Sequence, residues 1–262
     1  METNLKTLVI IPTYNERESL PEIVPQVLGQ GKSIALLIVD DNSPDGTGET
    51  AEELAREFSG RMSVLHRAEK NGLGSAYLDG FRWGLGQSKN LDYFIQMDAD
   101  GSHNPAEIPS LLAAAQSADL IVGSRYLNGV RILDWPIRRL LLSHVSNTIT
   151  QLATGLPLTD CTSGFKCFRR KTVEKILSVE IHAKSYDFQV EVNTFCKWLG
   201  FRLAEIPITF HNRNQGNSKL TRKDILRAAT VVFKLAFLRM LPLRFRFAEN
   251  AKSSKPTNNE TG

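Results

Sequence analysis

Apolar runs and helix-like segments alternate without interruption through the first 120 residues, and this alternation constrains the fold more than any other feature. Each run is short and continuous, which is typical of a strand buried on both faces of a sheet. The predicted strands span 8–11, 34–39, 62–65, 93–97 and 120–122. The predicted helices include 47–58, 73–85, 105–116 and, between the first two strands, one that buries Ile23, Val24, Val27 and Leu28. Such alternation predicts an α/β fold with a mainly parallel sheet flanked by helices.

The second half of the chain has a less regular pattern. Its predicted helices span 140–154, 187–199 and 224–239, and its predicted strands span 164–169 and 201–211. At 262 residues the chain is near the upper limit for one hydrophobic core. We therefore predict one α/β domain over 1–222, a basic amphipathic helical segment over 223–247 and a disordered tail over 248–262.

The formal net charge is +4, from 32 Lys and Arg against 28 Asp and Glu. This excess is too small to indicate nucleic-acid binding, and we expect no nucleic-acid partner. Basic residues are concentrated from Arg125 onward, so this half of the protein is expected to face something anionic. The sequence has no uncharged apolar stretch of about 18 residues and no secretion signal, which favours a cytoplasmic location. The three cysteines match neither zinc nor redox spacing and are expected to be buried thiols.

Asp98 and Asp100 close the predicted strand at 93–97 and precede Gly101, which permits a turn. Side-chain direction alternates along an extended strand, but Asp98 and Asp100 lie where the strand ends. The turn at Gly101 can bring their two carboxylates together. Two converging carboxylates repel each other unless a cation lies between them. Mg²⁺ suits such a pair, because it typically binds one or two carboxylates together with substrate phosphates and water. The alternative is a solvated turn that leads into a helix at Asn104.

Polar clusters also follow the first two predicted strands, at 12–16 and 40–45. Ligands of open α/β sheets bind beyond the carboxyl ends of the strands, so we expect the site there. A carboxylate of Asp40 or Asp41 can accept hydrogen bonds from a nucleobase or a ribose, and the alternative is a turn residue that binds its own backbone. No Gly-x-Gly-x-x-Gly follows the first strand and no P-loop motif occurs in the sequence, which argues against dehydrogenases and P-loop enzymes.

Eight motifs occur in one order along the chain, and together they carry a family resemblance. They are IIPTYNE (10–16), VDDNSPDGT (39–47), NGLGSA (71–76), DADGSH (98–103), GSRY (123–126), DCTSGF (160–165), FQVE (188–191) and RNQGNSK (213–219). This set resembles the family 2 glycosyltransferases with a GT-A fold over about residues 5–222. Within that family it is most similar to dolichol-phosphate and polyprenol-phosphate mannosyltransferases that have no C-terminal transmembrane helices.

The resemblance implies roles for individual residues. Asp98 and Asp100 look like metal-binding aspartates for Mg²⁺ or Mn²⁺, and Ser102 matches a further metal-proximal position. The implied nucleotide-sugar-binding residues are Pro12, Tyr14, Glu16, Val39, Asp41, Asp98, Ala99, Asp100, Arg125, Arg213 and Lys219. The positions that match an acceptor-phosphate site are Arg139 and Ser143. The implied catalytic residues are Asp98, Asp100, Arg125 and Asp160, where Asp160 orients the acceptor or a neighbouring arginine.

The implied reaction moves a sugar, preferably mannose from GDP-mannose, onto a polyprenyl or dolichyl phosphate, with inversion to a β-linked product. Such an acceptor is already an anion at neutral pH, because the second pKa of a phosphate is about 6, and no strong general base is needed. We accordingly expect His103 and His144 to be surface or helix-capping residues. The helix at 224–239 is expected to lie in a membrane interface or to pack on the domain. The protein would then be peripheral on the cytosolic face of a membrane, where it uses the membrane surface or a membrane partner subunit.

Three alternatives remain open from the sequence. The donor can be a UDP-sugar, for example UDP-glucose, used on the same class of lipid. The acceptor can be a polysaccharide or protein hydroxyl, which would require a carboxylate base, with Asp160 as the candidate. The chain can also be a nucleotide-sugar-binding or scaffold subunit without activity, although the intact acidic pair and the basic loop count against this.

Overall fold

The computed structural model describes residues 6–87, 89–133, 135–183, 185, 187–211 and 222–242, with the side chains of the last segment described from 229 onward. Within these residues the core is one seven-stranded sheet of order β3-β2-β1-β4-β6-β5-β7. The strands are β1 (Thr7–Thr13), β2 (Ile34–Asp40), β3 (Met62–His66), β4 (Tyr93–Gln96), β5 (Leu120–Ser124), β6 (Lys166–Arg169) and β7 (Leu203–Pro207). Neighbouring strands are parallel except around β6, which is antiparallel to both β4 and β5. The predicted α/β fold with a mainly parallel sheet is therefore confirmed.

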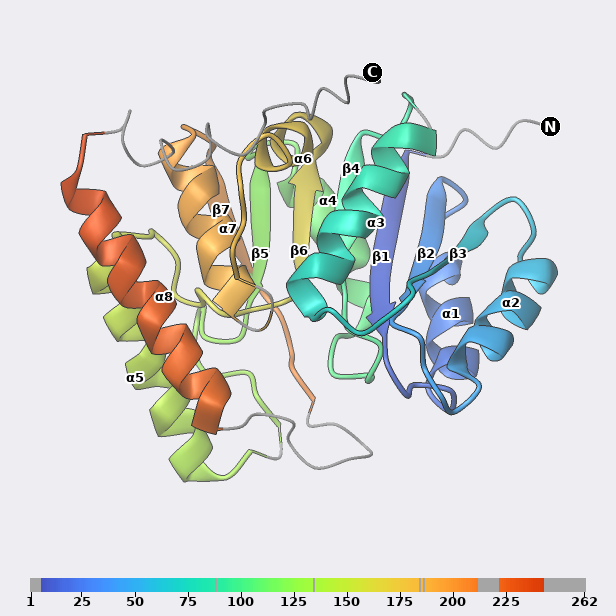
Figure 1. Ribbon diagram of the computed structural model, residues 1–262, viewed down its shortest axis with the longest axis horizontal. Helices are drawn as coiled ribbons and strands as arrows, with labels where there is room; N and C mark the ends of the chain where they lie inside the picture. Colours follow the sequence, from blue (N-terminus) through green and yellow to red (C-terminus); the bar gives the residue numbers. More distant parts are fainter. Residues whose placement is uncertain are drawn as a thin grey trace, which may run out of the picture.

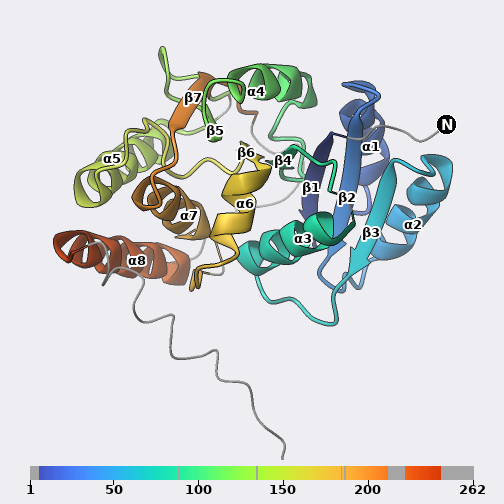
Figure 2. The ribbon, with the colours of Figure 1, turned by 90° about the horizontal axis from the view of Figure 1, so that it is seen from above.

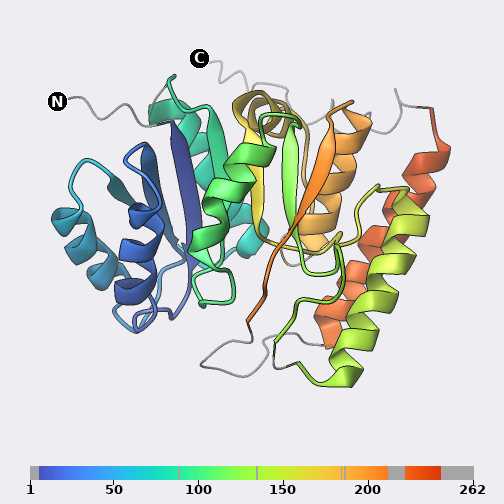
Figure 3. The same ribbon diagram turned by 180° about the vertical axis from the view of Figure 1, so that it is seen from behind.

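Helices cover both faces of the sheet (Figures 1 and 3). One face carries α1 (Leu20–Gly29), α2 (Thr47–Glu57), the short 3-10 helix η1 (Pro105–Glu107) and α4 (Ile108–Ala114). The other face carries α3 (Leu73–Gln87), α6 (Arg170–Ile176) and α7 (Asp187–Trp198). Two apolar clusters fill the spaces between the sheet and these layers, so β1 and β2 are buried on both sides.

Two longer helices lie beyond the β7 edge of the sheet. They are α5 (Ile137–Thr154) and α8 (Arg222–Met240), which contact each other, and α8 also contacts α7 (Figure 2). Leu235 of α8 is buried against Val190, Phe195 and Trp198 of α7. None of the helices in the described part of the chain is long and apolar enough to cross a bilayer.

The expected elements are present with small changes at their ends. The helix predicted over 105–116 is divided into η1 and α4, and Pro109 lies in the first turn of α4, where a missing N–H is tolerated. The strand predicted over 201–211 ends at Pro207. The helix α6, which has only seven residues, was not predicted from the sequence. All three cysteines are free and buried, as expected.

The domain boundaries stay predictions. The segment predicted at 223–247 begins in the structure as part of α8, which packs against α5 and α7 as described above. The tail predicted at 248–262 lies outside the described residues.

Candidate functional site at the carboxyl ends of the strands

The three predicted polar clusters lie along one edge of the sheet. β1 lies between β2 and β4, and both are parallel to it, so all three strands end at the same edge. Backbone hydrogen bonds join the strand ends: Asp41 N–H donates to the Thr13 carbonyl (3.0 Å) and Met97 N–H to the Ile10 carbonyl (3.2 Å). The segments 12–16, 40–45 and 98–102 are therefore neighbours in space, as the sequence predicted.

Asp98 contacts two buried side chains, Tyr77 and His103, that were not predicted to belong to the site. The Tyr77 hydroxyl donates to an oxygen of Asp98 (3.2 Å) and to the Met97 carbonyl (3.1 Å). Burial raises the pKa of Tyr77 well above its ordinary value, and the Asp98 and Asp100 carboxylates raise it further. Tyr77 therefore keeps its proton and remains a hydrogen-bond donor that orients Asp98.

His103 differs from the expectation of a surface or capping residue. Its ring is buried, stacks on Phe165 at a centroid distance of 5.0 Å, and its Nδ1 accepts from the Asp98 backbone N–H (3.1 Å). Burial lowers the pKa of His103 although Asp98 and Asp100 oppose this, so the ring is neutral with its proton on Nε2. The capping role belongs to the next residue, Asn104, whose side chain accepts from Ala106 N–H at the start of η1.

Asp98 and Asp100 form a partly exposed acidic pair around the buried Ala99. Gly101 adopts a φ of +73°, and the turn lets Asp100 accept from the Ser102 backbone N–H (3.0 Å). Both carboxylates act on the pKa of the same two buried groups, Tyr77 and His103, so both lie near these groups.

The donor atoms around the acidic pair fit a hard divalent cation. The Ser102 hydroxyl is buried and has no hydrogen-bond partner among the described residues, and the backbone N–H of the same residue contacts Asp100, so a third oxygen belongs to a residue next to the acidic pair. Mg²⁺ and Mn²⁺ prefer such oxygen ligands. Within the described ranges, no group of three or more His, Cys, Asp or Glu side chains is arranged to hold a metal, so water and substrate oxygens would have to complete the coordination.

The two aspartates after β2 have different environments. Asp40 accepts from the backbone N–H (3.2 Å) and hydroxyl (2.5 Å) of Ser43, so it stabilises the turn. Asp41 instead pairs with Arg67, which also donates to Asp79 and Ser75. Burial raises the pKa of Asp41, although Arg67 opposes this. The turn interpretation therefore applies to Asp40, and a role for Asp41 at a nucleoside stays a prediction.

The other candidate nucleotide residues lie around the ends of β1 and β2. Pro12 and Val39 pair across the two strands, and Val39 is completely buried, so it presents no exposed atom to a ligand in this structure. Tyr14 is half-buried, with the Lys70 ammonium 3.5 Å from its ring centroid. The Glu16 backbone N–H donates to the Thr47 hydroxyl, which ties this loop to the start of α2. Arg213 and Lys219 lie outside the described residues.

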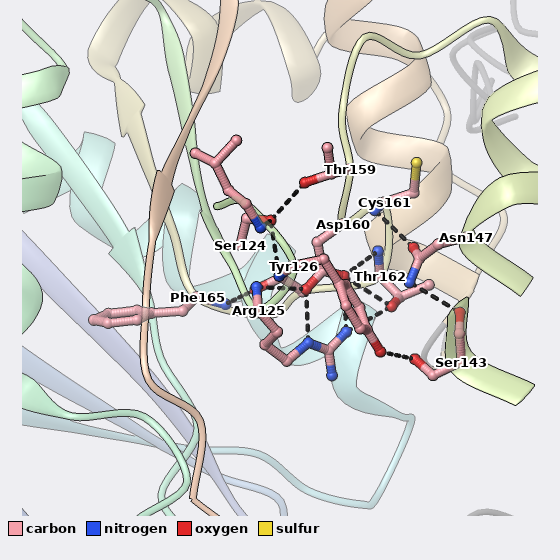
Figure 4. Close-up of polar contacts among 12 residues, drawn as sticks. Ser124, Arg125, Tyr126, Ser143, Asn147, Thr159, Asp160, Cys161, Thr162 and Phe165 are labelled. Carbon is pink, nitrogen blue, oxygen red and sulfur yellow. Dashed lines mark hydrogen bonds and ion pairs between the residues drawn. The ribbon is translucent and has the colours of Figure 1, made fainter. Parts of the chain in front are cut away.

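A buried ion pair joins the end of β5 to the loop before β6 (Figure 4). The Arg125 guanidinium donates to both oxygens of Asp160 (2.6 and 2.8 Å), and its backbone N–H donates to the same carboxylate (3.1 Å). Thr162 shares this network. Burial alone would raise the pKa of Asp160, but the Arg125 charge holds it below its usual value. Asp160 is thus a fully buried carboxylate that is already paired and has little basicity.

The two residues predicted for an acceptor phosphate lie next to this ion pair. Ser143 of α5 accepts from the Tyr126 hydroxyl (2.6 Å), and Tyr126 follows Arg125 in the chain (Figure 4). Arg139 lies one helical turn before Ser143, and its guanidinium is 3.8 Å from the Trp135 ring centroid. The Arg125 guanidinium lies 5.7 Å from the same ring centroid. Trp135 therefore lies against two arginines of the site, and no motif had indicated it.

The chain is similar to known proteins both in sequence and in fold. The family model for glycosyl transferase family 2 matches residues 8–177. The polyprenol monophosphomannose synthase of Mycolicibacterium smegmatis is 45% identical over 88% of this chain and 86% of that protein. The undecaprenyl-phosphate mannosyltransferase of Micrococcus luteus is 43% identical over 83% and 88%, respectively. The dolichol-phosphate mannosyltransferase of Pyrococcus furiosus is 35% identical over 88% of this chain and 64% of its own length.

A solved structure with a similar fold is that of glucosyl-3-phosphoglycerate synthase from Mycobacterium tuberculosis, in complex with Mn²⁺, UDP-glucose and phosphoglyceric acid. It has a TM-score of 0.64 and 16% sequence identity, and the match covers 89% of this chain and 80% of that one. At this identity the match supports the fold alone.

Proposed function

Because the chain belongs to glycosyl transferase family 2, we propose that it transfers a mannosyl group from a nucleotide sugar, preferably GDP-mannose, to a polyprenyl phosphate. The product would be a β-linked lipid-phosphate sugar, formed with release of a nucleoside diphosphate. The observation that carries this proposal is the buried Arg125–Asp160 pair beside Arg139. Arg139 offers positive charge to an anionic acceptor, and the ion pair removes the carboxylate that a hydroxyl acceptor would need as a base.

On the donor side, the nucleotide sugar would lie along the edge formed by the ends of β1, β2 and β4. Asp41, oriented by Arg67, would accept hydrogen bonds from the nucleoside, and Tyr14 would lie beside it. Asp98 and Asp100 would hold Mg²⁺ or Mn²⁺, and the synthase of similar fold was solved in complex with Mn²⁺. When bound, the cation neutralises charge on the departing diphosphate. Tyr77 keeps Asp98 aligned for this, and Arg213 and Lys219 are proposed phosphate contacts.

On the acceptor side, Arg139 and Ser143 would bind the lipid phosphate. The phosphate is itself the nucleophile and is ionised at neutral pH, so the protein needs to position it rather than deprotonate it. The Arg125 guanidinium is fixed by both oxygens of Asp160. It would lie between the donor diphosphate and the acceptor phosphate, which would otherwise repel each other. Asp160 in this scheme is a positioning residue for Arg125.

The exposed apolar side chains of α5 and α8 suit a membrane surface as the further partner. On α5 they are Ile137, Leu141, Leu142, Val145, Ile149 and Leu152, and on α8 they are Phe233, Phe237 and Met240. Each of these side chains is more than half exposed, and the exposed basic residues Arg138 and Lys234 lie among them. Apolar side chains interspersed with basic ones favour insertion into an interface of anionic lipids. The same helix α5 carries Arg139 and Ser143, so docking would bring the acceptor headgroup to the site.

A donor panel tests the reaction. GDP-mannose, GDP-glucose, UDP-glucose and UDP-mannose are each incubated with undecaprenyl phosphate and Mg²⁺ or Mn²⁺, and sugar is measured in the lipid extract. We expect alkali-stable, acid-labile lipid-linked mannose from GDP-mannose. If only a UDP-sugar gives product, the donor is that UDP-sugar and not GDP-mannose. Transfer only to a hydroxyl acceptor would overturn the proposal.

Flotation with vesicles that contain anionic lipid tests the membrane surface. The double variant Leu141→Asp with Phe237→Asp is expected to lower recovery in the vesicle fraction severalfold. The double variant Gln26→Asp with Ser110→Asp, at exposed positions of α1 and α4, is the charge-matched control and should leave recovery unchanged. Equal recovery of all three proteins would contradict a membrane role for α5 and α8.

A further inference from the structure

Gln189, in the first turn of α7, has a buried side-chain amide that lacks hydrogen-bond partners. The residue is 1% exposed, and neither Nε2 nor Oε1 has a partner among the described residues. Leaving both ends of an amide unsatisfied in the interior costs free energy, so such groups in folded proteins are normally completed by a ligand or by ordered water. The position of the Gln189 amide indicates which ligand would complete its hydrogen bonds.

The amide borders a small space next to the acidic pair. A Cβ atom placed on Gly164 would lie 3.5 Å from Nε2 of Gln189 and 3.6 Å from each carboxylate oxygen of Asp98. Because residue 164 is glycine, that point between the amide and the carboxylate is left unfilled. Gly164 belongs to the same loop as Asp160 and Thr162, so the loop that borders this space also forms the Arg125–Asp160 pair.

Both sides of this space are held rigidly. The Gln189 carbonyl accepts from Nζ of the buried Lys166 (3.0 Å), which anchors the first turn of α7 to β6. The ring of the preceding residue, Phe188, stacks on Tyr77 with centroids 6.1 Å apart, and Tyr77 donates to Asp98. One aromatic pair therefore fixes the distance between α7 and the carboxylate, so the amide is pre-oriented for a ligand.

We propose that the Gln189 amide binds a hydroxyl group of the transferred sugar and contributes to sugar selectivity. This inference rests on the proposed function, which places the diphosphate at Asp98 and Asp100, so the sugar attached to that diphosphate lies beside them. A phosphate group offers only acceptors and would leave the amide oxygen unpaired, whereas a sugar hydroxyl both donates and accepts. A buried polar group that must be satisfied by a substrate hydroxyl discriminates strongly against analogues that misplace it.

Calorimetry in the presence of Mn²⁺ separates the sugar from the rest of the donor. Two pairs are titrated, GDP-mannose against GDP and UDP-glucose against UDP, so that the measurement does not depend on the donor base. Gln189→Met is expected to raise the Kd of the sugar nucleotide about tenfold, as for the loss of a hydrogen bond to a neutral group, and to leave the Kd of the nucleoside diphosphate unchanged.

Two further variants make the test specific. Gly164→Ala should reproduce this pattern, because its methyl group meets only ordinary van der Waals distances and still occupies the space. Gln96→Met is the matched control: Gln96 is another buried amide without partners in the described residues, but it lies in β4 and is not among the atoms nearest Gly164. It should leave both dissociation constants unchanged.

Each remaining outcome counts against the inference. If Gln189→Met raises the Kd of the sugar nucleotide and of the nucleoside diphosphate equally, or raises neither, the amide binds water and the inference is wrong. The proposed function would then still stand. If the unmodified protein binds none of the four nucleotides, the proposed function fails and the inference fails with it.

Discussion

The donor half of the site, on β1, β2 and β4, and the acceptor half, on β5, β6 and α5, are assembled in different ways. On the donor side the turns after the strands are closed by local contacts: Asp100 accepts from Ser102 and Asp40 from Ser43, two and three residues away. Tyr77 and Arg67 then reach Asp98 and Asp41 from 21 and 26 residues away. On the acceptor side the decisive contacts are long-range: Arg125 meets Asp160 35 residues later, and Tyr126 meets Ser143 17 residues later. Substitution of a residue in the donor half should therefore affect sugar transfer more than folding, and substitution of a residue in the acceptor half should affect both.

The largest expected effect is on the donor side. Asp100→Ala should reduce transfer about a thousandfold or more, because one of two carboxylates that hold the charge-neutralising cation is lost. Asp100 is partly exposed, so the thermal midpoint of unfolding should stay within a few degrees of the unmodified protein. Product formation and circular dichroism measure the two quantities. Full activity that persists in the presence of EDTA would remove the metal from the scheme.

The next effect tests the ion pair of the acceptor half. Asp160→Ala leaves the Arg125 charge buried without its partner, and we expect the free energy of unfolding to fall by about 3–5 kcal/mol. Urea denaturation measures this change. Glu174→Ala, which breaks the exposed Arg170–Glu174 pair, should cost less than about 1 kcal/mol. Similar values for the two variants would mean that the Arg125–Asp160 pair does not hold the acceptor half together.

A third prediction concerns the buried Lys166 beneath the acceptor half. Burial lowers its pKa to about 7 in the folded protein, against about 10.4 in an unfolded chain. Between these values the unfolded state binds more protons, so this residue makes stability rise with pH by up to about 1.4 kcal/mol per unit, and fall as the pH drops toward 7. Lys166→Met should remove that slope in urea denaturation at pH 7, 8 and 9. Lys175→Met, at an exposed position of α6, controls for the lost charge and should keep the slope.

The smallest expected effect concerns Trp135, which lies against the acceptor arginine. Trp135→Leu should raise the KM for polyprenyl phosphate about five- to tenfold through loss of the cation–π contact with Arg139, and leave the KM for the donor unchanged. Trp135→Phe retains an aromatic face and should restore most of the affinity. If Leu and Phe behave alike, the ring does not position Arg139 and only fills space.

The sequence predicted most of the layer architecture because its evidence is local. Continuous apolar runs marked β1 and β2, and the helix expected between them buries Ile23, Val24, Val27 and Leu28 as stated. Motif reading also placed the acidic pair at the end of β4. The short helix α6 was missed, because seven residues are too few for a clear helical period.

Side-chain roles were harder to predict than elements. Two adjacent aspartates after β2 look equivalent in the sequence, but only the folded chain shows that Asp40 holds the turn and Asp41 faces Arg67. His103 was expected near the surface and is buried under Asp98, because Phe165 and Phe210 arrive from distant segments to cover it. Phe165 and Phe210 lie far from residues 98–103 in the sequence, so nothing next to that motif predicts that His103 is covered.

The sequence by itself determined the alternation of strand and helix, the edge of the sheet that carries the polar residues, and the acidic pair, because apolar periodicity and turn chemistry act between residues a few positions apart. Only the tertiary structure decided that Asp160 is neutralised by Arg125, that Tyr77 orients Asp98, and that Gln189 lies across Gly164 from that carboxylate. Those relations depend on which distant segments pack together in the core, and burial then sets the charge state and the hydrogen-bond partners of each group.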